Sequence, residues 1–168
     1  MNSIISSSIS TISKSNSLLQ NLSNEQLSDA SISPYYSCIG SHIRHIFDFY
    51  NCIFKGMESR EIDLTDRSRD VRIESDCQCA IESITEIIGK MNDLKNLESN
   101  LHLNVLDDLG HGKIKIQYTL GALLAQANSH AIHHYAIINY ILDRLGIKIE
   151  DETFGYNPST PKPETSLN

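Results

Sequence analysis

Five of the seven histidines in this chain fall in two short clusters, and they are the side chains best suited to chemistry. One cluster contains His42 and His45, and the other contains His130, His133 and His134. The second cluster lies in a stretch whose apolar residues recur with helical spacing, in which residues four apart share a face with Cβ atoms about 5–6 Å from each other. His130 and His134 are therefore spaced to place two imidazole nitrogens on one zinc-sized ion.

A third metal ligand would have to come from the other cluster, since His42 and His45 both lie on the expected inward face of their own helix. Three neutral histidines leave coordination positions open, which is typical of catalytic rather than structural metal sites. An ion held in this way lowers the pKa of a bound water or thiol to near or below neutrality. The alternative is a group of core or surface histidines satisfied by hydrogen bonds, because a single His-x-x-x-His pair is common. Both interpretations stay open at this point.

Asp48 is a candidate supporting residue, because it follows His45 by three positions. Its carboxylate could accept the second N–H of a ligand histidine, as carboxylates around metal sites commonly do. It could equally pair with Arg44 on an exposed surface, where ion pairs are common and weak.

Four further residues are candidates for substrate contacts. Three are arginines that lead into the third helix, Arg67, Arg69 and Arg72, and the fourth is Tyr135, which lies beside the histidines. A guanidinium binds a carboxylate through two parallel hydrogen bonds, so the arginines could hold a carboxylate-bearing thiol or acid. We favour the simpler interpretation that they bridge to the neighbouring acidic residues Asp63, Asp66, Asp70 and Glu74. The tyrosine could donate a proton, although most tyrosines at such positions pack with a satisfied hydroxyl group.

Four long helices are predicted from apolar residues that recur at helical intervals. They cover approximately residues 4–19, 37–55, 70–96 and 119–145. Between the last two helices, residues 101–117 alternate between apolar and polar types around a glycine-containing turn, which is typical of a β-hairpin. We therefore expect an all-α fold, a four-helix bundle with a small β-hairpin inserted before the last helix. Residues 21–34 are expected to form a loop, and residues 58–69 an irregular charged segment.

The chain has 168 residues, which is the length of one domain. Residues 1–36 are expected to supply a helix and a loop to the bundle, and residues 37–150 its metal-binding core. Residues 151–168 are rich in proline and are expected to form an irregular tail.

Both histidine clusters lie in segments that resemble the metal-binding helices of the DinB/YfiT-like superfamily. Residues 39–48, IGSHIRHIFD, resemble its second helix, and residues 129–136, SHAIHHYA, resemble its last helix. Residues 62–70 and 154–160 resemble one uncharacterised branch of it, so that the resemblance covers nearly the whole domain. The glutamine that follows the histidine pair in many relatives is replaced here by Ile137.

This resemblance implies a four-helix bundle in which His45, His130 and His134 bind zinc, nickel or a similar divalent ion. His42 is the alternative first ligand, and His133 could orient the site or bind substrate. Relatives include enzymes that use a low-molecular-weight thiol, and others are classed as hydrolases.

The composition narrows the range of functions. A net charge of −7 and a pI of about 5.4 argue against nucleic-acid binding, which needs a basic face. The longest apolar runs fall far short of the roughly 18 residues that span a membrane. The motifs of nucleotide-binding proteins, esterases and zincins are absent from the sequence. The four cysteines are expected to be reduced, and mostly core, residues of a cytoplasmic protein.

We therefore expect a metal-dependent enzyme, thiol transferase-like or hydrolase-like, that acts on an unknown small molecule. Metal binding should be lost on acidification through the ordinary histidine range near pH 6.5. A non-catalytic metal-binding module and a plain interaction bundle with incidental histidines are the alternatives. A homodimer formed through exposed helix faces is compatible with the sequence.

Overall fold

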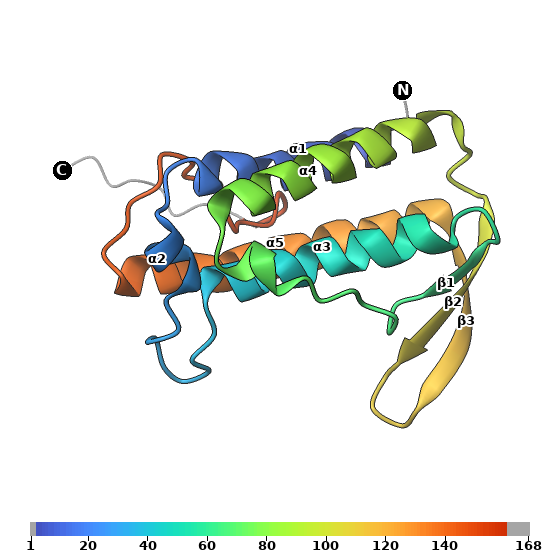
Figure 1. The fold of residues 1–168 in the computed structure, drawn as a ribbon. Coiled ribbons are helices and arrows are strands. Elements are labelled where there is room, and N and C mark those ends of the chain that lie inside the picture. Colours follow the sequence, from blue (N-terminus) through green and yellow to red (C-terminus); the bar gives the residue numbers. More distant parts are fainter. Residues whose placement is uncertain (1–2, 161–168) are drawn as a thin grey trace.

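Four long helices pack in two layers around one apolar core in the computed structural model, which describes residues 3–160 (Figure 1). They are α1 (Ser3–Leu19), α3 (Ile39–Gly56), α4 (Cys77–Asp93) and α5 (Leu120–Arg144). Helices α1 and α4 lie side by side in one layer and α3 and α5 in the other. Across the layers, α1 also contacts α5 and α3 also contacts α4.

The serine-rich helix α1 is held by packing against its neighbours. Serine has a low intrinsic helix propensity, so this helix needs tertiary support. Ser8 and Ser15 are fully buried, and the Ser15 hydroxyl lies 2.6 Å from the Tyr135 hydroxyl on α5. The small buried side chains allow α1 to lie close to the rest of the molecule.

A three-stranded sheet lies at one end of the helices, so the prediction of an all-α fold is wrong. The strands are β1 (Glu61–Asp63), β2 (His102–Asp108) and β3 (Lys113–Thr119), in the order β1-β2-β3. Strands β2 and β3 form the expected antiparallel hairpin, whereas β1 runs parallel to β2 with Ile62 opposite Val105. Residues 3–160 therefore form a mixed fold with five α-helices and a three-stranded mixed sheet.

The helix expected over residues 70–96 is divided. A 3-10 turn, η1 (Val71–Glu74), comes first, and a second one, η2 (Leu94–Asn96), follows α4. Helix α4 begins afresh at Cys77 because the Asp76 carboxylate accepts hydrogen bonds from the backbone N–H groups of Gln78 and Cys79.

The loop expected over residues 21–34 contains a further short helix, α2 (Asn24–Ser28). Ser23 and Gln26 form a reciprocal capping box at its start. Of the predicted C-terminal tail, residues 151–160 contain only turns, with Phe154 buried, and residues 161–168 lie outside the described part of the chain.

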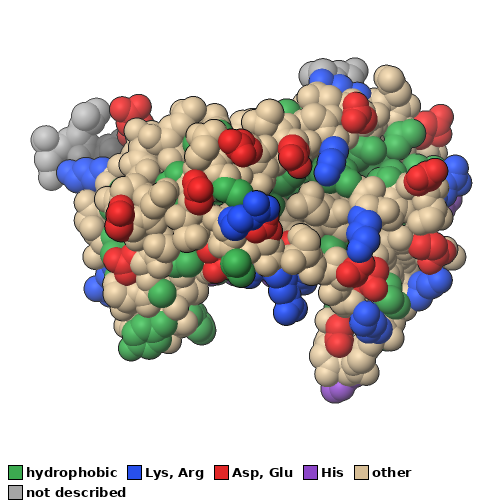
Figure 2. All heavy atoms as spheres, viewed as in Figure 1, with side chains coloured by type: hydrophobic (Ala, Val, Ile, Leu, Met, Phe, Trp, Pro, Cys, Tyr) green, Lys and Arg blue, Asp and Glu red, His purple; other side chains and the backbone are tan. Residues whose placement is uncertain are grey.

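Two projections give the lower side of the molecule a hollowed outline (Figure 2). One is the connection between α2 and α3, which carries the exposed Tyr35 and Tyr36, and the other is the β2–β3 hairpin. The four cysteines are free; Cys38 and Cys52 are buried, and Cys77 and Cys79 are half-buried. Within residues 3–160, no helix combines the length and apolar character needed to cross a membrane.

Candidate metal centre

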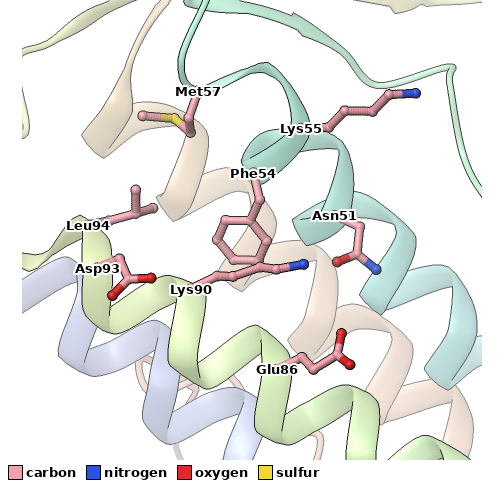
Figure 3. A pocket seen from close by; sticks show the side chains of 8 residues that line it. All are labelled: Asn51, Phe54, Lys55, Met57, Glu86, Lys90, Asp93 and Leu94. Carbon is pink, nitrogen blue, oxygen red and sulfur yellow. The ribbon is translucent and has the colours of Figure 1, made fainter.

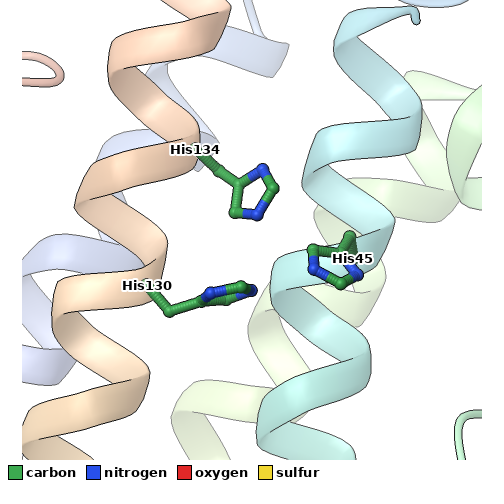
Figure 4. Close-up of side chains that lie close together, drawn as sticks. All are labelled: His45, His130 and His134. Atoms are coloured by element: carbon green, nitrogen blue, oxygen red, sulfur yellow. The ribbon is translucent and has the colours of Figure 1, made fainter. Parts of the chain in front are cut away.

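Three imidazole rings converge between α3 and α5 (Figure 4). His45 on α3 meets His130 and His134 on α5, with ring centroids 4.5–4.8 Å apart. Each residue offers one ring nitrogen, and these three nitrogens all lie within 4.8 Å of one another. Nitrogens around a tetrahedral zinc are roughly 3.4 Å apart, as follows from Zn–N bonds of about 2.0–2.1 Å. A small rotation of the rings would bring them to that spacing.

The two helices position these rings by simple periodicity. His130 and His134 are one helical turn apart, so both rings project from the same side of α5. On α3, Phe49 lies one turn after His45, and its ring packs 5.2 Å from that of His130. This aromatic contact supports one side of the cluster and keeps it partly apolar.

His130 provides the strongest sign that the cluster can bind a further group. Its Nε2 atom is buried and has no hydrogen-bond partner among the described residues. An unsatisfied buried polar atom costs about 1–3 kcal/mol, so native structures rarely retain one without a reason. An imidazole nitrogen beside two other imidazoles is the donor set that a divalent transition metal fits.

His42 contacts the cluster from outside and does not belong to the converging group. Its Nδ1 lies 2.8 Å from Nδ1 of His134, and its Nε2 lies 2.9 Å from the Ser37 hydroxyl. Two arrangements of the protons satisfy this chain of contacts, depending on the histidine tautomers. In one of them His134 donates to His42 and His42 donates to Ser37, which leaves Nε2 of His134 unprotonated.

That arrangement is the one that prepares His134 for a metal. In Figure 4 one ring nitrogen of His134 points toward the other two rings, and the second points away from them. Partners that hold the far nitrogen of a ligand histidine fix its tautomer and its orientation. His42 and Ser37 are placed for this role.

All four rings between α3 and α5 are favoured in their neutral form. Burial lowers the pKa of His45 to about 4, and electrostatic coupling to His130 and the positive charge of Arg67 add to the effect. Burial and the neighbouring histidines lower the pKa of His134 to about 3. The pKa values of His42 and His130 are also lowered, mainly by burial. Neutral imidazoles are the form that binds metal.

Of the three candidate arginines, Arg67 alone contacts the cluster. One of its terminal nitrogens lies 3.3 Å from Nδ1 of His45, and its Nε donates to the backbone carbonyl of Leu64 at 3.0 Å. The Arg69 side chain is exposed. Arg72 pairs with Asp70 on the surface at 2.6 Å, as the simpler interpretation predicts.

Asp48 is buried next to the cluster but does not hydrogen-bond to His45 in the structure. It accepts from Arg44 at 2.6 Å, from the Ser68 hydroxyl at 3.2 Å and from the Arg69 backbone N–H at 3.2 Å. Its pairing with Arg44 matches one of the two alternatives, although the pair lies in a buried setting and not on an exposed surface. The carboxylate thus fastens the connection between β1 and η1 onto α3.

Tyr135 and His133 point elsewhere. The Tyr135 hydroxyl bonds to Ser15 and donates to the carbonyl of Thr11, both on α1. Its ring stacks on Phe154, so Tyr135 is part of the core. His133 is exposed, with its ring 5.5 Å from that of His134.

Ser37 and Phe49 are the contributors that the sequence did not assign to the site. Phe49 lies one turn after His45 on the same helix, a spacing that places it beside the site but does not indicate its contact with His130. Ser37 has no spacing that indicates its role, because its contact with His42 depends on how the chain enters α3.

An open groove of about 560 Å³ lies apart from the histidines, between α3 and α4 (Figure 3). It is lined by Asn51, Phe54, Lys55, Met57, Glu86, Lys90, Asp93 and Leu94. Its charges are mixed in sign, and Lys90 lies over the Phe54 ring at 5.8 Å. Nothing in this groove gathers metal ligands.

Comparison with known proteins returned no relatives. No family model, no curated protein and no solved structure matches the chain. The resemblance to the DinB/YfiT-like superfamily therefore remains a prediction from the quoted segments, and the candidate metal centre stands on its geometry.

Proposed function

We propose that this chain binds one divalent metal ion through His45, His130 and His134 and acts as a metal-dependent enzyme on a small molecule. The observation that carries the proposal is the convergence of three neutral imidazoles, together with a buried ring nitrogen, Nε2 of His130, that has no hydrogen-bond partner among residues 3–160. Imidazole ligands suit zinc and nickel, whereas magnesium and calcium prefer oxygen. Zinc or nickel is thus the expected ion.

The partial exposure of the three rings supports a catalytic role. All three are half-buried, so solvent or a small molecule can reach them. Three histidines leave at least one coordination position for a substrate or water. A bound ion would act there as a Lewis acid that lowers the pKa of water or of a low-molecular-weight thiol.

The surrounding residues have separate tasks in this proposal. His42 and Ser37 hold the tautomer of His134, so that the proton stays on its far nitrogen. Phe49 covers His130 and restricts access of water from its side. Arg67 supplies a positive charge beside His45.

The test is the metal content of purified protein after incubation with zinc or nickel and removal of excess ion. The wild-type chain should retain about one ion, and His45→Ala, His130→Ala and His134→Ala should retain little. His111→Ala is the matched control, because His111 is exposed at the tip of the hairpin. Absence of a stoichiometric ion in the wild type, or its full retention in His134→Ala, would refute the proposal.

A further inference from the structure

Arg67 reveals the protonation state of His45. A guanidinium carries only donors, so the contact of 3.3 Å from Arg67 to His45 Nδ1 requires that Nδ1 be the acceptor. A neutral imidazole has one protonated nitrogen, and Nε2 of His45 must then carry the proton. In this structure the guanidinium occupies a lone pair of a candidate metal ligand.

Metal binding at His45 would break this contact whichever nitrogen is used. If Nδ1 takes the metal, the guanidinium has to leave that lone pair. If Nε2 takes the metal, the ring proton has to move to Nδ1, which then has no lone pair to accept a hydrogen bond from Arg67. Repulsion between the ion and the guanidinium acts in the same direction. The Arg67 guanidinium therefore loses its contact with His45 when the ion binds.

The freed guanidinium finds no unpaired carboxylate among the neighbouring acidic residues. Within the described chain no ion pair involves Arg67, and the acidic residues of the same region already have cationic partners. These pairs are Asp48 with Arg44, Asp63 with Lys113, and Asp66 with Lys55. Only the Leu64 carbonyl continues to hold Arg67, through Nε, which leaves the two terminal nitrogens for another acceptor.

Solvent reaches the side chains of this region. Arg67 is half-buried, like the three histidines. Figure 2 shows Lys or Arg atoms in the hollow of the lower side, where Figure 1 draws the connection between β1 and η1. A divalent ion held by three neutral rings adds further positive charge without any carboxylate ligand to offset it.

We propose that Arg67 anchors the carboxylate of a small anionic substrate, and that it becomes available when the metal displaces it from His45. This inference rests on the proposed function, since it requires an ion at the histidines. It names the substrate class as carboxylate-bearing molecules, because the planar end of a guanidinium pairs with a carboxylate through two hydrogen bonds.

The experiment uses the full chain loaded with cobalt(II), whose visible absorption reports on ligands near the ion. Acetate is titrated against wild type, Arg67→Met and Arg67→Lys, with acetamide as the neutral probe of equal size. Arg67→Met should bind acetate at least about tenfold more weakly than wild type, which is the loss expected for one charged hydrogen-bonded pair. Arg67→Lys should lie between them, because it keeps the charge without the planar fork. Acetamide should distinguish none of the three proteins.

Arg72→Met is the matched control, because it removes the same charge from a surface pair. It should bind acetate as the wild type does. Calorimetry without acetate gives a second readout, in which Arg67→Met should bind cobalt at least as tightly as wild type, since a competing donor is gone.

The outcomes separate the two proposals. If the wild type binds no cobalt, the proposed function fails and the inference fails with it. If cobalt binds but Arg67→Met and Arg67→Lys match the wild type in acetate affinity, the inference alone is wrong. Weaker cobalt binding by a folded Arg67→Met would overturn the displacement step.

Discussion

Acidification should leave metal binding almost unchanged down to about pH 5, well below the pH near 6.5 where ordinary histidines lose metals. The reason is that protons compete with a metal only for rings that they can occupy. Burial holds the pKa of His45 at about 4 and that of His134 at about 3. Both pKa values lie below the ordinary one, so the folded chain takes up these protons only at lower pH.

The expected difference is large. A ring with a pKa of 6.5 loses about 25-fold in metal affinity between pH 7 and pH 5, and two such rings would lose about 600-fold. With pKa values of about 4 and about 3 for His45 and His134, the combined loss at pH 5 stays below about twofold. Near pH 6, two ordinary rings would together release about 1.5 protons when the metal binds, whereas these rings should release almost none.

Isothermal titration calorimetry measures both quantities. Zinc affinity is determined at pH 7, 6 and 5, and proton release at pH 6 is obtained from buffers that differ in ionisation enthalpy. Circular dichroism at each pH shows that the chain is folded. A fall in affinity near 600-fold between pH 7 and pH 5, or release of about 1.5 protons by folded protein, would refute the neutral, buried state assigned to these histidines.

Four substitutions, one of them a control, test the surroundings of the site and the packing of α3. Gly40→Ala should lower the free energy of unfolding by at least about 2 kcal/mol in a denaturant titration, because its Cβ would lie 2.2 Å from a backbone carbonyl oxygen of η1. Gly89→Ala, with no atom within 4 Å of the new Cβ, should leave the free energy of unfolding unchanged or raise it. Equal effects of the two substitutions would contradict the close approach of Gly40 to the backbone of η1. His42→Ala should weaken zinc binding about 10- to 100-fold in a chelator competition assay by freeing the tautomer of His134, and an unchanged affinity would deny His42 that role. Tyr135→Phe should cost about 1–2 kcal/mol of stability with normal metal content, and loss of the metal would place Tyr135 in the site after all.

The sequence predicted those features that depend on local spacing. The four long helices follow from apolar periodicity, and the pairing of His130 with His134 follows from one helical turn. Strand β1 was missed because it has only three residues, Glu61–Asp63, in a charged segment, and it becomes a strand only by pairing with β2. Its presence is why the all-α prediction failed.

The spacing of residues along the sequence could not predict contacts between distant segments. From the sequence, His42 and His45 were equivalent candidates for the first metal ligand. The hydrogen bond between His42 and His134 distinguishes them, and spacing could not predict this bond because the two residues are 92 positions apart. Arg67 could not be distinguished from Arg69 and Arg72, since their surroundings depend on how the segment after β1 folds back on α3.

The small, buried hydroxyl side chains of α1 have a consequence for the order of folding. A segment with so low an intrinsic helix propensity gains its structure by packing on α4 and α5, which follow it by more than 50 residues in the chain. It should therefore dock late, after those surfaces have assembled. During synthesis α1 would therefore stay unfolded until α4 and most of α5 have emerged.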